Sequence, residues 1–407
     1  MSKVDSSRNV IFLVVVAALG YFVDIYDLVL FSIVRIESFK DLGIADDQMR
    51  VMGEYVINMQ MGGLLLGGIL WGIMGDKIGR IKVLFGSILM YSLANIANGF
   101  VNDIDTYALV RLVAGIGLAG ELGAGITLVS ESMSKENRGY GTMIVAGVGL
   151  FGAVLANKVH ELHDWRTAYF VGGGLGMILL LLRVGTFESG MFKEVAHKKV
   201  EKGNVMLILG NTKRLFKYIN CIFIGAPLWF VVGILVTQSP EIGKALGATE
   251  PLSAGKGIMY TYTGIAVGDI FAGLLAQITR SRKRTMFVFH VLSILSILIF
   301  LSSKGLSSER FLWLCTFLGF SVGYWATFVT IASEQFGTNI RATVTTTVPN
   351  FVRGALIPIT FLYEFFVKQF NIITAAYILT ILLSVLALFS LSQLRESFGK
   401  NLDYVEE

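Results

Sequence analysis

The chain has 407 residues, of which 54% are hydrophobic and only 15% are charged, and its formal net charge at pH 7 is +5. Soluble domains contain roughly 45–50% apolar and about 25% charged residues, so this composition excludes an ordinary soluble protein and indicates an integral membrane protein. The basic residues form no patch with interleaved aromatic residues, and we expect no nucleic-acid partner.

Twelve apolar runs follow one another along the chain. A helix needs about 20 apolar residues to cross about 30 Å of hydrocarbon. The runs are continuous rather than alternating, which excludes the strands of a membrane barrel. The first run is too long for the core of a signal peptide. We predict an all-α membrane protein with twelve transmembrane helices at 10–34, 52–75, 83–101, 106–130, 139–159, 166–187, 217–238, 256–279, 285–302, 310–333, 342–367 and 370–394.

Lysine and arginine are unequally divided between the connecting segments. The segments on the side of the N-terminus hold about twice as many as those on the other side, and the largest group lies between Arg183 and Lys217. Basic residues are enriched in cytoplasmic loops. We therefore predict a multi-pass protein of the cell (inner) membrane with both termini in the cytoplasm.

One long polar segment, 188–214, interrupts the series after the sixth run. It predicts an N-terminal six-helix bundle over 1–187, a cytoplasmic linker over 188–214 and a C-terminal six-helix bundle over 215–407. The two halves share marks at one offset: Glu131 and Arg138 follow the fourth run, and Glu334 and Arg341 follow the tenth, with six residues between the members of each pair. Repeated halves are a design of secondary transporters.

The loop after the second run reads Gly72-Ile-Met-Gly-Asp76-Lys-Ile-Gly79-Arg80-Ile-Lys82. It resembles the signature loop of the major facilitator superfamily, and Arg111-Leu-Val-Ala-Gly115 resembles the fourth-helix motif of that family. The resemblance implies two six-helix bundles related by pseudo-two-fold symmetry and a gate at the cytoplasmic end, where Asp76 would contact the start of the eleventh helix near Arg341. The expected gate residues are Gly72, Asp76, Gly79, Arg80, Glu131, Arg138, Glu334 and Arg341.

Asp24-Ile-Tyr26-Asp27 in the first run resembles an element of metabolite:proton symporters and relatives of the sugar porters. The closing Pro-Glu-Thr signature of sugar porters is absent, since Leu394-Arg-Glu396-Ser397 stands in its place. The resemblance therefore implies a metabolite symporter and does not favour a sugar.

Six charged residues lie well inside apolar runs. Each would cost roughly 2.5–3.5 kcal/mol at mid-bilayer, so all six must pair or face a wet cavity. They are candidates for proton coupling or substrate contact: Asp24, Asp27, Arg111, Glu121, Asp269 and Arg353.

Asp24 and Asp27 are three residues apart and share a helix face, so together they could bind a proton. Alternatively, one of them pairs with Arg111 to hold helices together. Glu121 lies among glycines, where it could serve coupling or a packing hydrogen bond. Asp269 and Arg353 could contact ion or substrate, or pair with each other. Two interior arginines favour an organic anion or zwitterion.

Aromatic residues inside the runs are candidates for the wall of a solute cavity, although packing and interface anchoring are alternatives. The candidates are Tyr26, Trp229, Tyr262 and Trp325. Neither cysteine lies in a metal-binding spacing, and the pair His160 and His163 lies in a loop, so we expect no metal, no cofactor and no enzyme.

The sequence predicts a secondary active transporter that carries a small polar metabolite by alternating access, with protons as the coupling ion and the bilayer as its setting. A facilitator or exporter of sugars or other solutes on the same fold stays open, as do a non-transporting receptor and a channel. No obligate protein partner is evident.

Overall fold

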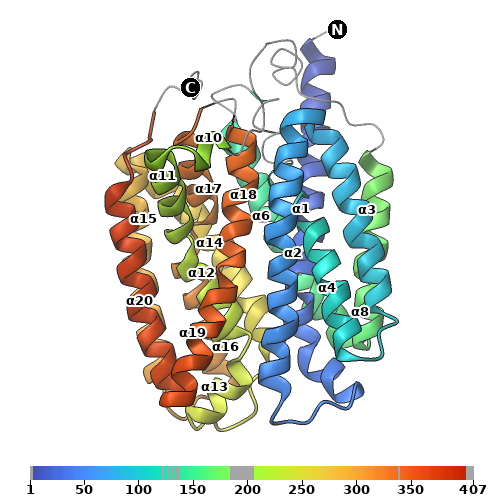
Figure 1. The fold of residues 1–407 in the computed structure, drawn as a ribbon, viewed down its shortest axis with the longest axis vertical. Coiled ribbons are helices and arrows are strands. Elements are labelled where there is room, and N and C mark those ends of the chain that lie inside the picture. The colour runs from blue at the N-terminus through green and yellow to red at the C-terminus, as the bar shows by residue number, and fades with distance from the viewer. Residues whose placement is uncertain are drawn as a thin grey trace.

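The computed structural model describes residues 3–121, 138–183, 206–337 and 340–399, together with Gly123, Gly125, Val129 and Met133. Within these residues the elements are helices, without a strand. Helices α1 to α8, which we call the first half, stand beside helices α10 to α20, the second half (Figure 1). Helix α1 starts at the end where α10 lies, and α13 lies at the opposite end, which we call the distal end (Figure 1).

The first half consists of long helices and two that follow each other after a short break. Their bounds are α1 (Lys3–Asp41), α2 (Met49–Ile78), α3 (Arg80–Asn98), α4 (Ile104–Leu118), α6 (Arg138–Leu150), α7 (Gly152–Leu162) and α8 (Trp165–Leu182).

The second half contains more broken helices. Their bounds are α10 (Met206–Leu209), α11 (Thr212–Phe223), α12 (Ala226–Phe230), the π-helical segment η2 (Val231–Val236), α13 (Ser239–Ala245), α14 (Ala254–Thr279), α15 (Arg282–Ser302), α16 (Ser308–Ser321), α17 (Trp325–Glu334), α18 (Arg341–Gly354), α19 (Leu356–Gln369) and α20 (Ile372–Gln393).

The predicted all-α membrane architecture is confirmed. In the described part of the chain, 11 helical segments are long and apolar enough to cross a bilayer. The predicted span at 106–130 runs on past α4 into residues of which half are not described. The first helix is longer than predicted, because its polar last turns remain packed on the protein instead of ending at the apolar run.

The predicted span at 342–367 is divided at Ala355 into α18 and α19. Pro358 has no N–H to donate to the carbonyl of Gly354, so the helical hydrogen-bond ladder is interrupted there. The predicted span at 217–238 is likewise interrupted at Gly225, just before Pro227, and continues through η2. These interruptions lie at the level of the interior charges, where backbone irregularity is tolerated only inside protein.

Glycines set the distance between helices at the same place in both halves. In the first half, a Cβ added to Gly115 of α4 would collide with the carbonyl of Gln60 of α2. In the second half, a Cβ on Gly319 of α16 would collide with the carbonyl of Thr261 of α14. Small residues at a membrane-helix interface allow backbones to approach closely, so in each half one helix pair packs backbone against backbone at this point.

Gly319→Ala should lower the stability of the protein by about 1–3 kcal/mol, because a methyl group against backbone forces α14 and α16 apart. Gly273→Ala on α14 is the matched control, since no atom lies within 4 Å of its added Cβ. It should be neutral or stabilising by up to about 1 kcal/mol. The measurement is the apparent Tm of each purified variant in detergent, and equal Tm values for the two would contradict this packing.

Candidate functional site

All six interior charges are buried, the most exposed being Asp269 at 7%. They come from both halves, and five of them meet a charged partner. Burial of this extent matches the expectation that ionised groups inside the bilayer lie against protein and not against lipid.

Arg111 and Asp27 form an ion pair inside the first half. Nη1 of Arg111 lies 2.8 Å from Oδ1 of Asp27 and neither side chain is exposed. The same guanidinium donates to Asn95 at 3.2 Å and to Gln60 at 3.3 Å, so α4 is joined to α1, α2 and α3. A further donation to the carbonyl of Asp27 and the ring of Tyr169 at 5.5 Å complete its surroundings. This cluster of hydrogen bonds joins four helices.

Asp24 and Arg353 form an ion pair between the halves. Nη2 of Arg353 on α18 lies 3.6 Å from Oδ2 of Asp24 on α1. Neither carboxylate oxygen accepts a hydrogen bond from the residues that the structure describes. Arg353 also donates to Oδ1 of Asn350 at 3.4 Å and lies over the ring of Trp325 at 5.7 Å. Compared with Asp27, Asp24 is held loosely and by a residue of the other half.

The two aspartates of the first helix thus have separate partners. A spacing of three residues places side chains about 60° apart around a helix axis. That angle is small enough for a shared face but large enough for Asp27 to meet α4 while Asp24 meets α18.

Glu121 pairs with Arg183, and each is 1% exposed. Nη1 of Arg183 lies 3.0 Å from Oε2 of Glu121, and Nη2 makes a second, short contact to Oε1. Arg183 was grouped with the basic residues around the linker, although it falls inside the predicted run 166–187. That position, together with Glu121 inside another run, was the available signal for this pair.

Asp269 meets the start of a helix instead of Arg353. Its Oδ1 accepts from the backbone N–H of Ala326 at 3.0 Å, in the first turn of α17. A carboxylate is stabilised there by the free N–H groups and the helix dipole. Asp269 therefore anchors α14 to α17 beside the cavity described next.

A small cavity lies between the halves. Its wall is aromatic and aliphatic, and Arg353 is the one charged group among the described residues that line it. Of the predicted aromatic residues, Trp229, Tyr262 and Trp325 are in the wall, whereas Tyr26 donates to the carbonyl of Ala168 at 2.8 Å inside the first half. The remaining lining residues are Tyr21, Ile25, Leu28, Leu150, Leu228 and Ile265.

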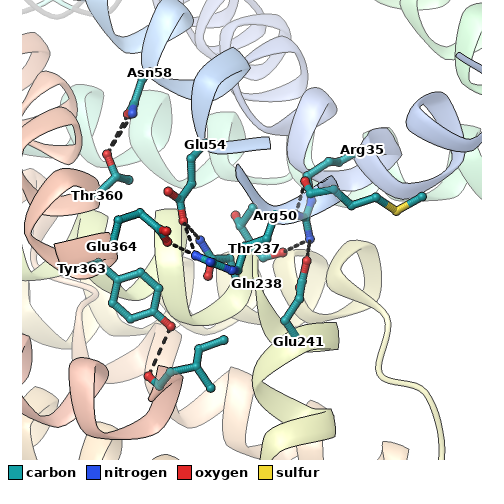
Figure 2. Close-up of polar contacts among 12 residues, drawn as sticks. Arg35, Arg50, Glu54, Asn58, Thr237, Gln238, Glu241, Thr360, Tyr363 and Glu364 are labelled. Carbon is teal, nitrogen blue, oxygen red and sulfur yellow. Dashed lines mark hydrogen bonds and ion pairs between the residues drawn. The ribbon is translucent and has the colours of Figure 1, made fainter. Parts of the chain in front are cut away.

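A polar network joins the halves at the distal end (Figure 2). Arg35 pairs with Glu241 at 2.7 Å, and Gln238 donates to Glu54 at 2.7 Å. We call the whole set the distal network, and it also includes the pair Arg50–Glu364 and the hydrogen bond of 2.9 Å from Asn58 to Thr360 (Figure 2).

The distal network was not predicted from the sequence. Arg35 and Arg50 stand at the ends of apolar runs, where side chains are usually solvated. The signal was present in part, since Glu241 lies in the first turn of α13 and Glu364 lies inside the apolar sequence of α19.

The predicted gate lies at the end opposite the distal network. A Cβ on Gly72 would be 3.5 Å from Thr347, so α2 and α18 approach closely there. Gly79 connects α2 to α3 with a φ of 104°, a backbone conformation that favours glycine. Glu131 and the side chains of Asp76, Arg80 and Arg138 lie outside the described residues, and so does the expected contact of Asp76 near Arg341.

The second-half members of the predicted gate are described. Glu334 accepts from Ser397 at 2.6 Å and pairs with Arg282 at 3.5 Å. Arg341 donates to the carbonyl of Ser333 at 3.2 Å. These contacts hold the ends of α17, α18 and α20 near the start of α15.

The sequence of this chain is similar to a known protein family and to individual transport proteins. A family model described as Major Facilitator Superfamily matches residues 12–360. A putative metabolite transport protein of Haemophilus influenzae is 27% identical over 406 residues, which cover 95% of this chain and 96% of that protein. The 3-(3-hydroxy-phenyl)propionate transporter of Escherichia coli is 32% identical over 154 residues, 33% of this chain and 36% of that protein.

A solved structure shares the fold. It is that of the proton:xylose symporter XylE bound to 6-bromo-6-deoxy-D-glucose, with a TM-score of 0.72, 16% sequence identity and coverage of 98% of both chains.

Weakening the distal network should open the cavity to solvent. Glu241→Gln combined with Glu364→Gln removes the charged partners that the second half provides to Arg35 and Arg50. Charge-assisted hydrogen bonds contribute roughly 1.5–3 kcal/mol each, so a maleimide should modify a cysteine placed at Leu28 in the cavity wall at least about five-fold faster. The native Cys221 and Cys315 are buried and add little background.

Glu161→Gln is the control for this experiment, because Glu161 pairs with the exposed Lys158 on the same helix. It should leave the labelling rate unchanged. Equal rates for the control and the double variant would show that the distal network does not close the cavity.

Proposed function

The chain belongs to the major facilitator superfamily and is a multi-pass membrane transporter, and on that premise we propose that it is a proton-coupled symporter of a small organic anion. The observation that carries this proposal is the inter-half pair of Asp24 and Arg353. It combines the one charged residue of the described cavity wall with a carboxylate that accepts no hydrogen bond from the described residues.

The cavity favours a solute with a carboxylate and an apolar, planar body. Arg353 presents a guanidinium, whose fork of donors matches a carboxylate. Trp229, Tyr262 and Trp325 offer flat apolar faces around it. The similar 3-(3-hydroxy-phenyl)propionate transporter is named for an aromatic acid. An aromatic monocarboxylate therefore combines the features that this cavity can recognise.

Proton coupling follows from charge balance at the same pair. In the empty protein, Asp24 balances Arg353 in a setting where an unpaired charge would be costly. An incoming carboxylate competes with Asp24 for the guanidinium, and two anions facing one cation in a low dielectric are unfavourable. Binding a proton to Asp24 removes that conflict. The pair can thus hold either the Asp24 anion or the solute anion together with one proton.

Alternating access is supported by the arrangement of contacts between the halves. The cavity lies between the distal network and the close contact of α2 with α18. Rocking of one half against the other would expose it to one side and then the other. We propose that both termini face the cytoplasm, so that the distal network closes the cavity toward the outside.

Asp24→Asn should uncouple transport from protons. In proteoliposomes the variant should still exchange benzoate across the membrane, but it should lose accumulation driven by a pH gradient, because no proton is bound or released at position 24. Asp103→Asn is the control, since Asp103 is an exposed helix cap on α4. Accumulation by Asp24→Asn equal to that of the parent would contradict coupling at this residue.

Arg353→Gln should weaken binding of benzoate by about ten-fold or more, which corresponds to losing a charge-assisted contact of roughly 1.5–3 kcal/mol. Benzamide, which has the same ring without the charge, should bind the parent weakly and be little affected. Ligand-dependent shifts in Tm measure both affinities. Arg310→Gln, at an exposed arginine, is the control. Equal affinity of the parent for benzoate and benzamide would exclude an anion site at Arg353.

A further inference from the structure

The side-chain amide of Asn350 connects Arg353 to the first half. Asn350 is buried in α18, and its Nδ2 donates to the carbonyl of Ala119 at 2.9 Å and to that of Thr346 at 2.8 Å. Its Oδ1 accepts from Nη1 of Arg353 at 3.4 Å. One amide thus joins the end of α4 in the first half, the backbone of α18 and the cavity arginine.

The orientation of this amide follows from its partners. Backbone carbonyls only accept hydrogen bonds, so the NH₂ group must face Ala119 and Thr346. The oxygen of Asn350 is then directed to Arg353, which only donates. The reversed amide would set its NH₂ group against the guanidinium and its oxygen against two carbonyls. Only this orientation of the Asn350 amide therefore pairs each donor with an acceptor.

Two glycines allow the contact across the halves. Ala119 lies directly after the last residue of α4. The carbonyl groups at the C-terminal end of a helix lack an intrahelical donor. A Cβ on Gly68 of α2 would lie 3.0 Å from the Cβ of Asn350, and one on Gly123 would collide with Thr346. The backbones of both halves thus approach α18 closely enough for a direct bond to its asparagine.

We propose that Asn350 is a positioning residue that directs Arg353 into the anion site only while α4 and α18 are in contact. When the halves separate at this level, the bond to Ala119 breaks and the amide loses one of the two carbonyls that orient it. Oδ1 of Asn350 is then no longer held in position to accept from Arg353. The high-affinity arrangement of the arginine depends in this way on closure of the α4–α18 contact. The role in anion binding rests on the proposed function, whereas the link between Asn350 and Arg353 does not.

A double-mutant cycle tests that link without a ligand. Asn350→Leu removes the three hydrogen bonds at similar volume, and Asp24→Asn removes the charged partner of Arg353. If Asn350 directs Arg353 toward Asp24, the change in apparent Tm of the double variant should differ from the sum of the single changes by more than about 2 °C. Asn350→Ser replaces Asn350→Leu if the latter is not monodisperse.

Asn58→Leu is the matched control, because Asn58 makes another amide hydrogen bond between the halves, to Thr360, without contacting Arg353. Its effect should add to that of Asp24→Asn. Additivity for Asn350 as well would overturn the proposal, since the asparagine would then only hold the halves together.

Ligand binding provides the second measurement. Asn350→Leu should weaken benzoate binding by about ten-fold and leave benzamide binding unchanged, while Asn58→Leu changes the two ligands alike. An equal loss for both ligands in Asn350→Leu would overturn the positioning role. Failure of the parent to bind benzoate would count against the proposed solute class, and the double-mutant cycle would still decide the role of Asn350.

Discussion

Charge in a medium that solvates it poorly is the constraint on which this structure depends. Three pairs, Asp27–Arg111, Glu121–Arg183 and Asp24–Arg353, carry most of the interior charge that the structure describes. The first two lie within one half and are closely hydrogen-bonded. Removing one partner of such a pair leaves an uncompensated buried charge, which costs several kcal/mol. These pairs therefore hold the first half as a unit.

The third pair differs in each respect that matters for transport. It bridges the halves, its carboxylate has no hydrogen bond within the described chain, and its arginine faces the cavity. Around it, glycines bring α2 and the end of α4 against α18. A half whose charges pair within it, with one loosely held charge pair at its boundary, is an arrangement in which one change of partner can alter the contact between the halves.

Much of the fold could be predicted from the sequence, because membrane spans require long apolar runs whatever their neighbours are. Burial of the six interior charges could be foreseen for the same energetic reason. Their pairing could not, since the partners of Asp24 and Asp27 depend on a 60° difference in direction and on which helix lies on each side. Arg183, Arg35 and Glu364 stand at the ends of apolar runs, where a sequence alone does not separate solvated from buried side chains.

Under the proposed proton coupling, the equal and opposite charges of Asp24 and Arg353 also determine which energy source can drive the carrier. A monovalent anion that moves together with one proton transfers no net charge, so the work done by the membrane voltage on the loaded protein cancels. Accumulation then has a ceiling set by acidity alone. Each pH unit across the membrane is equivalent to about 1.4 kcal/mol, or about ten-fold in solute concentration. A cell using this carrier would concentrate its solute in acidic surroundings and, at equal pH on both sides, would only equilibrate it.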